Sequence, residues 1–368
     1  MSKKNICVLA GDGIGKEVTD WGVQALETAG SYHNLSFNFQ YELLGHAAIQ
    51  ATGEPMPAAT LASCKAADAV LLGAIGDPHY DLNPHLKVRP EQGLLALRKG
   101  MGLFANIRPI LLFDELLTAS SLKEEIIRGT DILFFRELTG GIYFGQPRGR
   151  KEDGTVAFDT KIYAKYEVER IARMAFEAAK TRKKVLHSVD KANVLESSRL
   201  WREVVQELAA EYPEVMVIHM FVDNAAMQLI KDPKQFDVVL TGNMFGDILT
   251  DEASQIAGSL GMLASASLGN EVGLFEPIHG SAPDIAGQNL ANPLATILST
   301  ALMCDRSLNA PAAGQLIVDA VDAVLKAGYR TRDIMDQNTD TDKILGTQEM
   351  GAQVLKTINT VAKQNVLA

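Results

Sequence analysis

The sequence predicts an α/β fold in which a largely parallel sheet is built from apolar strands that alternate with helices. Short apolar runs, such as NICVLA at residues 5–10, are followed by turns and helical patterns, which is typical of this class. With 368 residues the chain can bury a large core, and two lobes are expected. Because the sequence contains no repeat, low-complexity tract or long linker, we expect these lobes to be interwoven, with the chain crossing between them.

The first hundred residues have the pattern of repeated strand and helix. NICVLA predicts a strand, GDGIG a tight turn, and the stretch to about Gly30 an amphipathic helix. Further strands are expected at FNFQYELL and at residues 69–72, and the helical GLLALRKG precedes an extended ANIRP. This order supports a sheet whose strands are joined by helices.

The middle of the chain has a segment of different character, about residues 140–163. It is rich in glycine and charge but has β-forming ends, so we expect a protruding hairpin or arm that pairs with its own copy. Around it, strands are predicted at ILFFREL, KVLHSVD, VMVIHMFVD and FDVVLTGN, and helices at KYEVERIARMAFEAAKTRKK, SRLWREVVQELAAEY and MFGDILTDEASQIAG. After about residue 292 the pattern is mostly helical, with a loop near residues 331–341.

Composition excludes several classes of protein. Hydrophobic residues make up 47% and charged residues 22%, and the net charge of −10 argues against nucleic acid as a partner, which requires a basic surface. Cys7, Cys64 and Cys304 form neither a metal pair nor a disulfide framework, so a reducing cytosol is expected. The apolar run at residues 6–10 is too short for a signal peptide, and no stretch approaches the ~20 apolar residues of a membrane span.

Asp247 and Asp251 carry the clearest chemical signal. They lie four residues apart in a segment that reads as helical, which places both carboxylates on one face, roughly 6 Å apart at Cβ. Two carboxylates this close repel unless a cation lies between them, and Mg2+ prefers oxygen ligands. Asp223, which we expect at the end of the strand MVIHMFVD, would add a third carboxylate. The sequence therefore predicts a divalent-metal site.

Three arginines adjoin apolar segments and could bind a di- or tricarboxylate. Arg98 follows GLLAL, Arg108 precedes a proline, and Arg136 ends the apolar part of a strand. A guanidinium grips carboxylates bidentately, but three structural ion pairs are the alternative unless the fold brings the arginines together. Tyr143 and Lys191 are expected where strands pass into loops, and a lysine near a metal and arginines would suit proton transfer, although either residue alone is more often a packing or surface residue.

Two glycine-containing segments bear on nucleotide binding. GDGIG at residues 11–15 departs from the GxGxxG fingerprint, which favours a plain strand-to-helix turn and argues against a Rossmann fold. EPIHGSAPDIAG at residues 276–287 is a turn-rich loop with backbone N–H groups outside regular structure, so it can wrap a nucleotide.

Seven segments together resemble motifs of the isocitrate and isopropylmalate dehydrogenases, a family of metal-dependent β-decarboxylating dehydrogenases. They are GDGIGKEV, ANIRP, RELTGGIYFG, DKANVL, VDNAAMQL, GNMFGDILTDEAS and EPIHGSAPDIAG, and they span nearly the whole chain. The resemblance implies a three-layer α/β/α fold with two interwoven lobes around a mixed sheet, and not a Rossmann fold. It also implies NAD-dependent oxidative decarboxylation of 3-isopropylmalate to 4-methyl-2-oxopentanoate and CO2 in leucine biosynthesis, with Mg2+ or Mn2+.

The resemblance also assigns roles to residues. Lys191 would accept the hydroxyl proton and Tyr143 would protonate the enol. The metal ligands would be Asp223, Asp247 and Asp251. Substrate contacts would come from Arg98, Arg108, Arg136, Asp223, Glu91, Leu94, Leu95 and Val194. NAD would contact Ile14, Glu276, His279, Gly280, Ser281, Ala282, Pro283, Asp284, Ile285, Ala286, Gly287 and Asn292, with His279 against the adenine and Asp284 at the adenosine ribose.

The resemblance implies a division of labour between lobes and between subunits. Residues 1–103 and 259–368 would form the first lobe and carry most of the NAD site. Residues 104–258 would form the second lobe, with the arm and the dimer interface. Lys191 and Asp223 would reach the active site of the other subunit, so the enzyme would be a homodimer with shared sites. The cysteine pattern described above would place this homodimer in the cytoplasm.

Two features bear on specificity. On a helix Leu94 and Leu95 share the face of Arg98, which makes an apolar patch that suits an isopropyl group and disfavours a third carboxylate beside Glu91; ordinary core packing is the alternative. Asp284 can accept hydrogen bonds from both ribose hydroxyls and would repel a 2′-phosphate, and Ile285 offers that phosphate no partner.

The rival functions are relatives acting on isocitrate, homoisocitrate or tartrate, and a non-catalytic regulatory subunit. A phosphate-handling enzyme ranks last, because GxxxxGK[ST] is absent.

Overall fold

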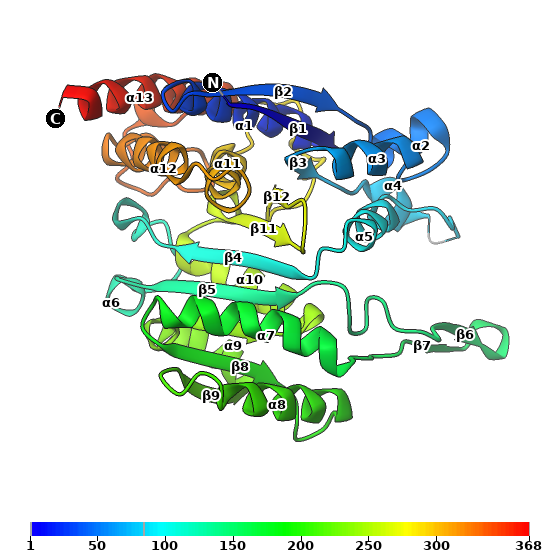
Figure 1. The fold of residues 1–368 in the computed structure, drawn as a ribbon. Coiled ribbons are helices and arrows are strands. Elements are labelled where there is room, and N and C mark those ends of the chain that lie inside the picture. Colours follow the sequence, from blue (N-terminus) through cyan, green and yellow to red (C-terminus); the bar gives the residue numbers. More distant parts are fainter. Residues whose placement is uncertain (1, 84, 368) are drawn as a thin grey trace. The chain divides into compact units, whose positions relative to one another are not determined.

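The structure is a computed structural model that describes residues 2–83 and 85–367. The chain divides into two compact units, of which the first comprises Met1–Leu103, Phe113–Ser121 and Ala257–Ala368, and the second Phe104–Leu112 and Leu122–Ile256. Neither unit is one continuous segment. In Figure 1 the first unit accordingly joins blue elements from the start of the chain with orange and red elements from its end.

The sheet of the first unit is mixed. Its strands are β1 (Ser2–Gly11), β2 (Leu35–Tyr41), β3 (Ala69–Ala74), β11 (Ala264–Leu268) and β12 (Leu274–Pro277). They lie in the order β2-β1-β3-β12-β11, and the pairs are parallel except for β11 with β12. Every residue of β3 is buried, as expected for a continuous apolar run inside a parallel sheet.

Helices carry most of the remaining chain of the first unit. They are α1 (Gly15–Ser31), α2 (His46–Thr52), α3 (Ala58–Ala66), α4 (Pro78–Leu82), α5 (Pro90–Gly100), α11 (Leu294–Arg306), α12 (Pro311–Lys326) and α13 (Thr347–Leu367), with short 3-10 turns at η1 (Asp114–Leu116), η4 (Leu260–Met262) and η5 (Thr341–Lys343). Helices α1, α11, α12 and α13 pack on one another around a core that includes Leu26, Phe275, Ile297 and Val321.

The second unit also has a mixed sheet. Its strands are β4 (Ala105–Leu111), β5 (Asp131–Glu137), β8 (Val185–Asp190), β9 (Met216–Phe221) and β10 (Val238–Thr241). They lie in the order β4-β5-β10-β8-β9, and all pairs are parallel except β4 with β5. Both units confirm the predicted α/β class with mixed strand directions.

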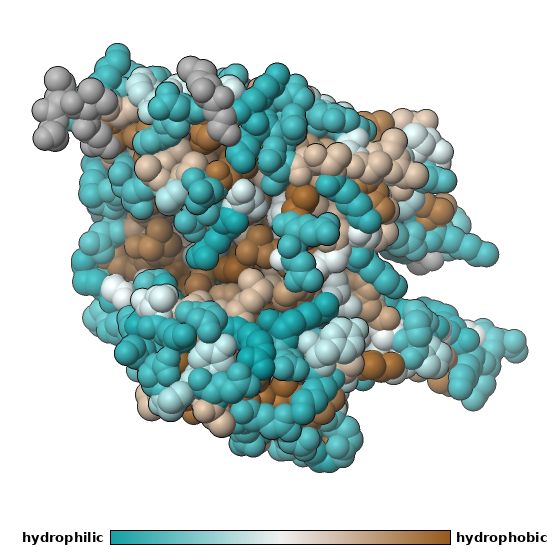
Figure 2. Space-filling model, viewed as in Figure 1, coloured by the Kyte–Doolittle hydropathy of each residue, from teal (hydrophilic) through white to brown (hydrophobic). Residues whose placement is uncertain are grey.

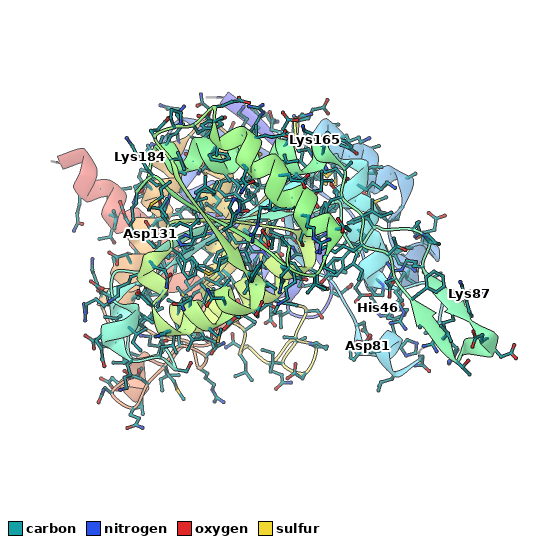
Figure 3. The ribbon with its side chains drawn as sticks, turned by 90° about the horizontal axis from the view of Figure 1, so that it is seen from below. His46, Asp81, Lys87, Asp131, Lys165 and Lys184 are labelled. Carbon is teal, nitrogen blue, oxygen red and sulfur yellow. The ribbon has the colours of Figure 1, made fainter. Side chains whose placement is uncertain are left out.

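Helices cover both faces of this second sheet. They are α6 (Glu124–Ile127), α7 (Lys165–Lys180), α8 (Glu196–Ala209), α9 (Val222–Lys231) and α10 (Asn243–Ala257), with a 3-10 turn at η3 (Pro233–Gln235). Figure 1 shows α7 in front of the strands and α10 behind them. In Figure 3 the labelled Lys165 and Lys184 mark the two ends of the segment that contains α7, and Asp131 marks the start of β5.

The glycine- and charge-rich segment forms the hairpin that the sequence predicts. Strands β6 (Gly149–Lys151) and β7 (Val156–Phe158) pair antiparallel as a separate sheet, with η2 (Glu152–Gly154) at the tip. The hairpin projects from the second unit in Figure 1, and Figure 2 shows mainly hydrophilic side chains on its visible face.

The structure corrects the expected place of Asp223, and it also bears on membrane crossing. Asp223 does not end a strand, because β9 stops at Phe221 and Asp223 lies in the first turn of α9. Within the described part of the chain, no helix has the length and apolar character that crossing a membrane requires.

Candidate functional site

Five of the predicted site residues come together in the second unit. Asp247 and Asp251 lie one turn apart on α10. The Arg108 guanidinium approaches both carboxylates, with Nη2 3.7 Å from Asp247 Oδ1 and Nη1 3.8 Å from Asp251 Oδ1. Arg136 donates through Nη1 to Asp247, and the Tyr143 hydroxyl donates to Asp247 Oδ2 at 2.9 Å. We call these five residues the α10 cluster.

The two arginines of the α10 cluster are buried and held in place. They lie on the antiparallel neighbours β4 and β5, where Arg108 is paired with Phe134 and Arg136 with Asn106. Arg108 is 5% exposed and Arg136 3%. Such buried guanidinium groups have little rotational freedom, so they form a fixed cationic surface beside the two carboxylates.

Three residues that hold these arginines were not predicted from the sequence. Asn106 Oδ1 accepts from Arg108 Nε at 2.6 Å, and Thr250 Oγ1 accepts from Arg108 Nη1 at 2.5 Å. Asn243 Oδ1 accepts from Arg136 Nε and Nη2 at 3.1 and 2.9 Å. A usable signal did exist, because Asn243 and Thr250 are four residues before and three after Asp247 in the same helix.

The electrostatics of the α10 cluster favour a protonated tyrosine. Burial, together with the negative charge of Asp247, raises the pKa of Tyr143 to about 12. Burial also raises the pKa of Asp251, an effect that the nearby Arg108 opposes. At neutral pH Tyr143 therefore keeps its proton and can act as an acid.

The carboxylates of Asp247 and Asp251 are the groups of the α10 cluster that could hold a divalent metal. Two carboxylates on one helix face match the oxygen ligands that Mg2+ or Mn2+ prefers. Among residues 2–83 and 85–367, however, no three His, Cys, Asp or Glu side chains gather as a metal site. Asp223 of the same chain therefore does not complete the pair formed by Asp247 and Asp251.

Lys191 and Asp223 form a separate pair, also in the second unit. Lys191 follows β8, and its Nζ lies 2.5 Å from Asp223 Oδ1. This hydrogen bond lowers the pKa of Asp223. The Asp223 side chain is 62% exposed, and Val194, whose N–H donates to the Lys191 carbonyl at 3.0 Å, is 61% exposed. We call Lys191, Val194 and Asp223 the outward group.

Arg98 lies in the first unit with a partner of its own. It is buried on α5, and its Nη2 donates to Glu276 Oε1 on β12 at 2.8 Å. Glu276 Oε1 also accepts from Ser267 Oγ at 3.2 Å. The predicted cofactor residue Glu276 thus holds Arg98, whose buried Nε has no hydrogen-bond partner in the described chain. Leu94 and Leu95 are only half-buried, so they are not part of the closed core, and Glu91 is exposed.

The predicted cofactor loop rests on the start of α1. Ser281 O accepts from the Ile14 N–H at 2.8 Å, and the Gly287 N–H donates to Glu17 Oε1 at 3.2 Å. Ile14 is buried beneath Ala282, Ile285 and Ala286. Gly13 (φ +52°) must be glycine, since a Cβ there would lie 2.0 Å from Ser281 O. The GDGIG turn thus supports this loop.

The loop presents other residues outward. Gly280, Pro283 and Asp284 are exposed, and the Asp284 carbonyl, not its carboxylate, accepts from Gln288 Nε2 at 2.6 Å. Burial lowers the pKa of His279, which favours a neutral ring for stacking.

Asn292 is engaged within the chain. Its Oδ1 accepts from the Leu294 N–H at 2.9 Å at the start of α11, and its Nδ2 donates to Asp333 Oδ2 at 3.0 Å. The side chain therefore anchors the start of α11.

Comparison with known proteins gives consistent matches. The family model described as isocitrate/isopropylmalate dehydrogenase matches residues 5–354. The 3-isopropylmalate dehydrogenase of Synechococcus sp. (strain CC9605) is 55% identical over 361 residues, which is 97% of this chain and 100% of that protein. The 3-isopropylmalate dehydrogenase of Chromohalobacter salexigens is 57% identical over 358 residues, covering 96% and 98%.

Solved structures share the fold. The isocitrate dehydrogenase from Methylococcus capsulatus superposes with a TM-score of 0.85 at 32% identity, covering 97% of this chain and 99% of that one. A β-decarboxylating dehydrogenase from Thermococcus kodakarensis gives a TM-score of 0.79 at 33% identity, with 100% and 99% covered.

Proposed function

Because the chain belongs to the isocitrate/isopropylmalate dehydrogenase family, we propose that it catalyses the NAD-dependent oxidative decarboxylation of 3-isopropylmalate in leucine biosynthesis. The products are 4-methyl-2-oxopentanoate and CO2. The relatives of 55% and 57% identity that bear the name 3-isopropylmalate dehydrogenase support this substrate. The observation that carries the chemistry is the α10 cluster, in which two carboxylates, two arginines and a tyrosine meet.

The arginines bind and orient the dicarboxylate. Arg108 and Arg136 offer fixed N–H groups beside the carboxylates of α10, and the unpartnered Nε of Arg98 is a buried donor that a substrate carboxylate can satisfy. Holding the substrate in one orientation removes part of the entropic barrier to reaction.

Lys191 and Tyr143 move the protons. Lys191 Nζ accepts the proton of the substrate hydroxyl as the hydride leaves the adjacent carbon. Tyr143 O–H then donates a proton to the enol carbon after CO2 departs, in keeping with the raised pKa that keeps this phenol protonated. These roles require both side chains to lie near the same substrate. Tyr143 belongs to the α10 cluster, however, and Lys191 to the outward group.

Asp247 and Asp251, with Asp223 of a second subunit, would hold Mg2+ or Mn2+. When bound, the cation supplies Lewis-acid stabilisation of the negative charge that develops on the substrate oxygen.

NAD would accept the hydride from the substrate. The exposed Asp284 and its neighbour Ile285 favour NAD over NADP, because a carboxylate repels a 2′-phosphate and the aliphatic chain offers it no partner.

The enzyme acts as a homodimer with shared sites. Large apolar side chains are exposed on the helices that carry the acidic residues, namely Met227 and Ile230 on α9 and Ile248 on α10. A second copy covering this face would bury them, and it would bring the outward group of each chain to the α10 cluster of the other. In this proposal Asp223 of the second subunit adds a third carboxylate to Asp247 and Asp251.

Leu94, Leu95 and Val194 select the isopropyl group. The two leucines are half-buried on α5 near Arg98, and Val194 is exposed, so all three can be buried by an apolar substituent. A third carboxylate, as in isocitrate, would be desolvated there and would lie near Glu91.

The buried, unlinked thiols of Cys7, Cys64 and Cys304 are consistent with our proposal of a cytoplasmic enzyme.

The test is NAD reduction with separate 2-hydroxy acids: 3-isopropylmalate, isocitrate, homoisocitrate and tartrate. We expect 3-isopropylmalate to be strongly preferred, NAD to be favoured over NADP, and EDTA to abolish turnover until Mg2+ or Mn2+ is restored. Equal turnover of isocitrate would overturn the substrate, full activity in EDTA would overturn the metal, and no turnover of any acid would support a regulatory subunit.

A further inference from the structure

The side chain of Asn243 forms hydrogen bonds with two separate parts of the candidate site. It is the first residue of α10, it is 1% exposed, and it lies one turn before Asp247. Its Oδ1 accepts from Nε and Nη2 of Arg136 at 3.1 and 2.9 Å. Its Nδ2 donates to the carbonyls of Leu138 and Gly140 at 3.0 and 3.2 Å. The amide thus uses both its donors and its acceptor inside the protein.

These bonds tie three parts of the site together. The guanidinium of Arg136 also donates through Nη1 to Asp247, so Asn243 and Asp247 hold it from two sides. Leu138 and Gly140 lie in the loop that leads from β5 to Tyr143. In addition, the Asn243 main-chain N–H donates to the buried Tyr163 hydroxyl at 2.8 Å. One residue therefore joins the substrate arginine, the loop of the acid and the helix of the metal ligands.

Glycines on both sides of Asn243 make this arrangement possible. A Cβ at Gly246 would lie 2.8 Å from Arg136 Cγ, and a Cβ at Gly242 would lie 3.1 Å from the Tyr163 hydroxyl. Both distances are shorter than ordinary contacts between non-bonded heavy atoms. The start of α10 thus approaches Arg136 and Tyr163 closely, which brings a side chain as short as asparagine within reach of the guanidinium.

We propose that Asn243 is a positioning residue that presents the Arg136 guanidinium to a substrate carboxylate and holds the loop that carries Tyr143. This inference rests on the proposed function, in which Arg136 binds substrate and Tyr143 acts as the acid. Without Oδ1, the guanidinium loses the acceptor that holds two of its nitrogens and turns toward the Asp247 carboxylate. Substrate binding weakens as a result, and so does the proton transfer that needs Tyr143 in place.

The test compares Asn243→Ala and Asn243→Asp with the unmodified enzyme, using the 2-hydroxy acid that the unmodified enzyme oxidises fastest. Substrate Kd is measured by titration calorimetry with Mg2+, alongside kcat and both KM values. For Asn243→Ala we expect substrate Kd and KM to rise roughly 10- to 100-fold, the scale of lost hydrogen bonds to a charged group, while the KM for NAD stays within about twofold. Asn243→Asp keeps an acceptor for Arg136 but lacks the amide donors to Leu138 and Gly140, so substrate Kd should rise less than in Asn243→Ala, while kcat should fall below that of the unmodified enzyme.

A matched control separates positioning from general instability. Val205→Ala removes buried methyl groups from α8 in the same unit, outside the α10 cluster. It should lower the unfolding temperature without raising substrate Kd. An unchanged substrate Kd in Asn243→Ala would overturn the proposal. If Asn243→Ala does not fold, Asn243→Asp provides the test. Wild-type kcat and KM in Asn243→Asp would show that the hydrogen bonds from the amide to Leu138 and Gly140 are not needed for catalysis, which would overturn the proposal. The substrate is identified with the unmodified enzyme alone. A wrong assignment of the substrate would therefore be detected before any Asn243 variant is measured, and it can be told apart from failure of the Asn243 proposal.

Discussion

The α10 cluster and the outward group lie in the same unit but have opposite surroundings. Asp247 receives hydrogen bonds from Arg136 and Tyr143 and lies near Arg108, all of the same chain. Asp223 has Lys191 as its partner, and its side chain is 62% exposed. The α10 cluster is thus organised within one chain, whereas the outward group presents a lysine, a carboxylate and a valine to whatever covers it. This difference motivates our proposal of a site shared between two subunits.

The largest effect is expected for the proton-transfer residues, one from each side of the comparison. Lys191→Met and Tyr143→Phe should each lower kcat by about 10²- to 10⁴-fold, the usual contribution of a positioned acid or base. Steady-state rates with saturating NAD and 3-isopropylmalate measure this. Near-normal kcat in either variant would remove that residue from the chemistry, and a loss confined to Tyr143→Phe would leave the outward group without a catalytic role.

The two aspartates should differ in what they contribute to folding. Asp247→Asn weakens contacts to two buried arginines and should reduce the free energy of unfolding by about 1–3 kcal/mol, a range that allows for the partial exposure of this carboxylate. Asp223→Asn breaks an exposed, solvent-screened ion pair and should change the free energy of unfolding much less than Asp247→Asn does. Urea unfolding of the two variants at one protein concentration measures the difference. Equal losses would contradict the contrast between the two groups.

Smaller effects are expected for the apolar side chains that we propose to contact the isopropyl group. Leu94→Ala should reduce kcat/KM for 3-isopropylmalate by about 1–3 kcal/mol, the scale of lost methylene contacts in an apolar pocket. Val194→Ala should also lower kcat/KM, by less than about 1.5 kcal/mol, because fewer carbons are removed. Val194 is 61% exposed in the single chain, so its truncation should disturb the packing of that chain little. Wild-type kcat/KM in Val194→Ala would mean that no partner brings this side chain to the substrate.

Local patterns predicted the shared helix face of two candidate site residues, whereas long-range contacts determine the hydrogen bonds that the sequence did not predict. The shared face of Asp247 and Asp251 follows from helical periodicity alone. The hydrogen bonds from Arg108 to Asn106 and Thr250 depend on the side-chain directions of β4 and on how α10 packs against it, which no local pattern contains.

Three other outcomes illustrate the same limit. Glu276 binds Arg98 across 178 positions of sequence, a contact set by tertiary structure. Asn292 was predicted to contact NAD, but its side chain accepts a hydrogen bond from the Leu294 N–H at the start of α11, a contact that the prediction did not include. Asp223 lies in the first turn of α9, and the sequence did not show this because the apolar run of β9 continues through Val222 without a break at the boundary between strand and helix.

The most direct test of a shared site is complementation between two inactive chains. Lys191→Met and Tyr143→Phe chains carrying different affinity tags are coexpressed, and the heterodimer is isolated by tandem purification. If Lys191 serves the α10 cluster of its partner, each heterodimer contains one site with both groups intact and should show about half the wild-type kcat per dimer. If each site takes both groups from one chain, every site in the heterodimer is defective, and activity no higher than that of the parent variants would contradict the account.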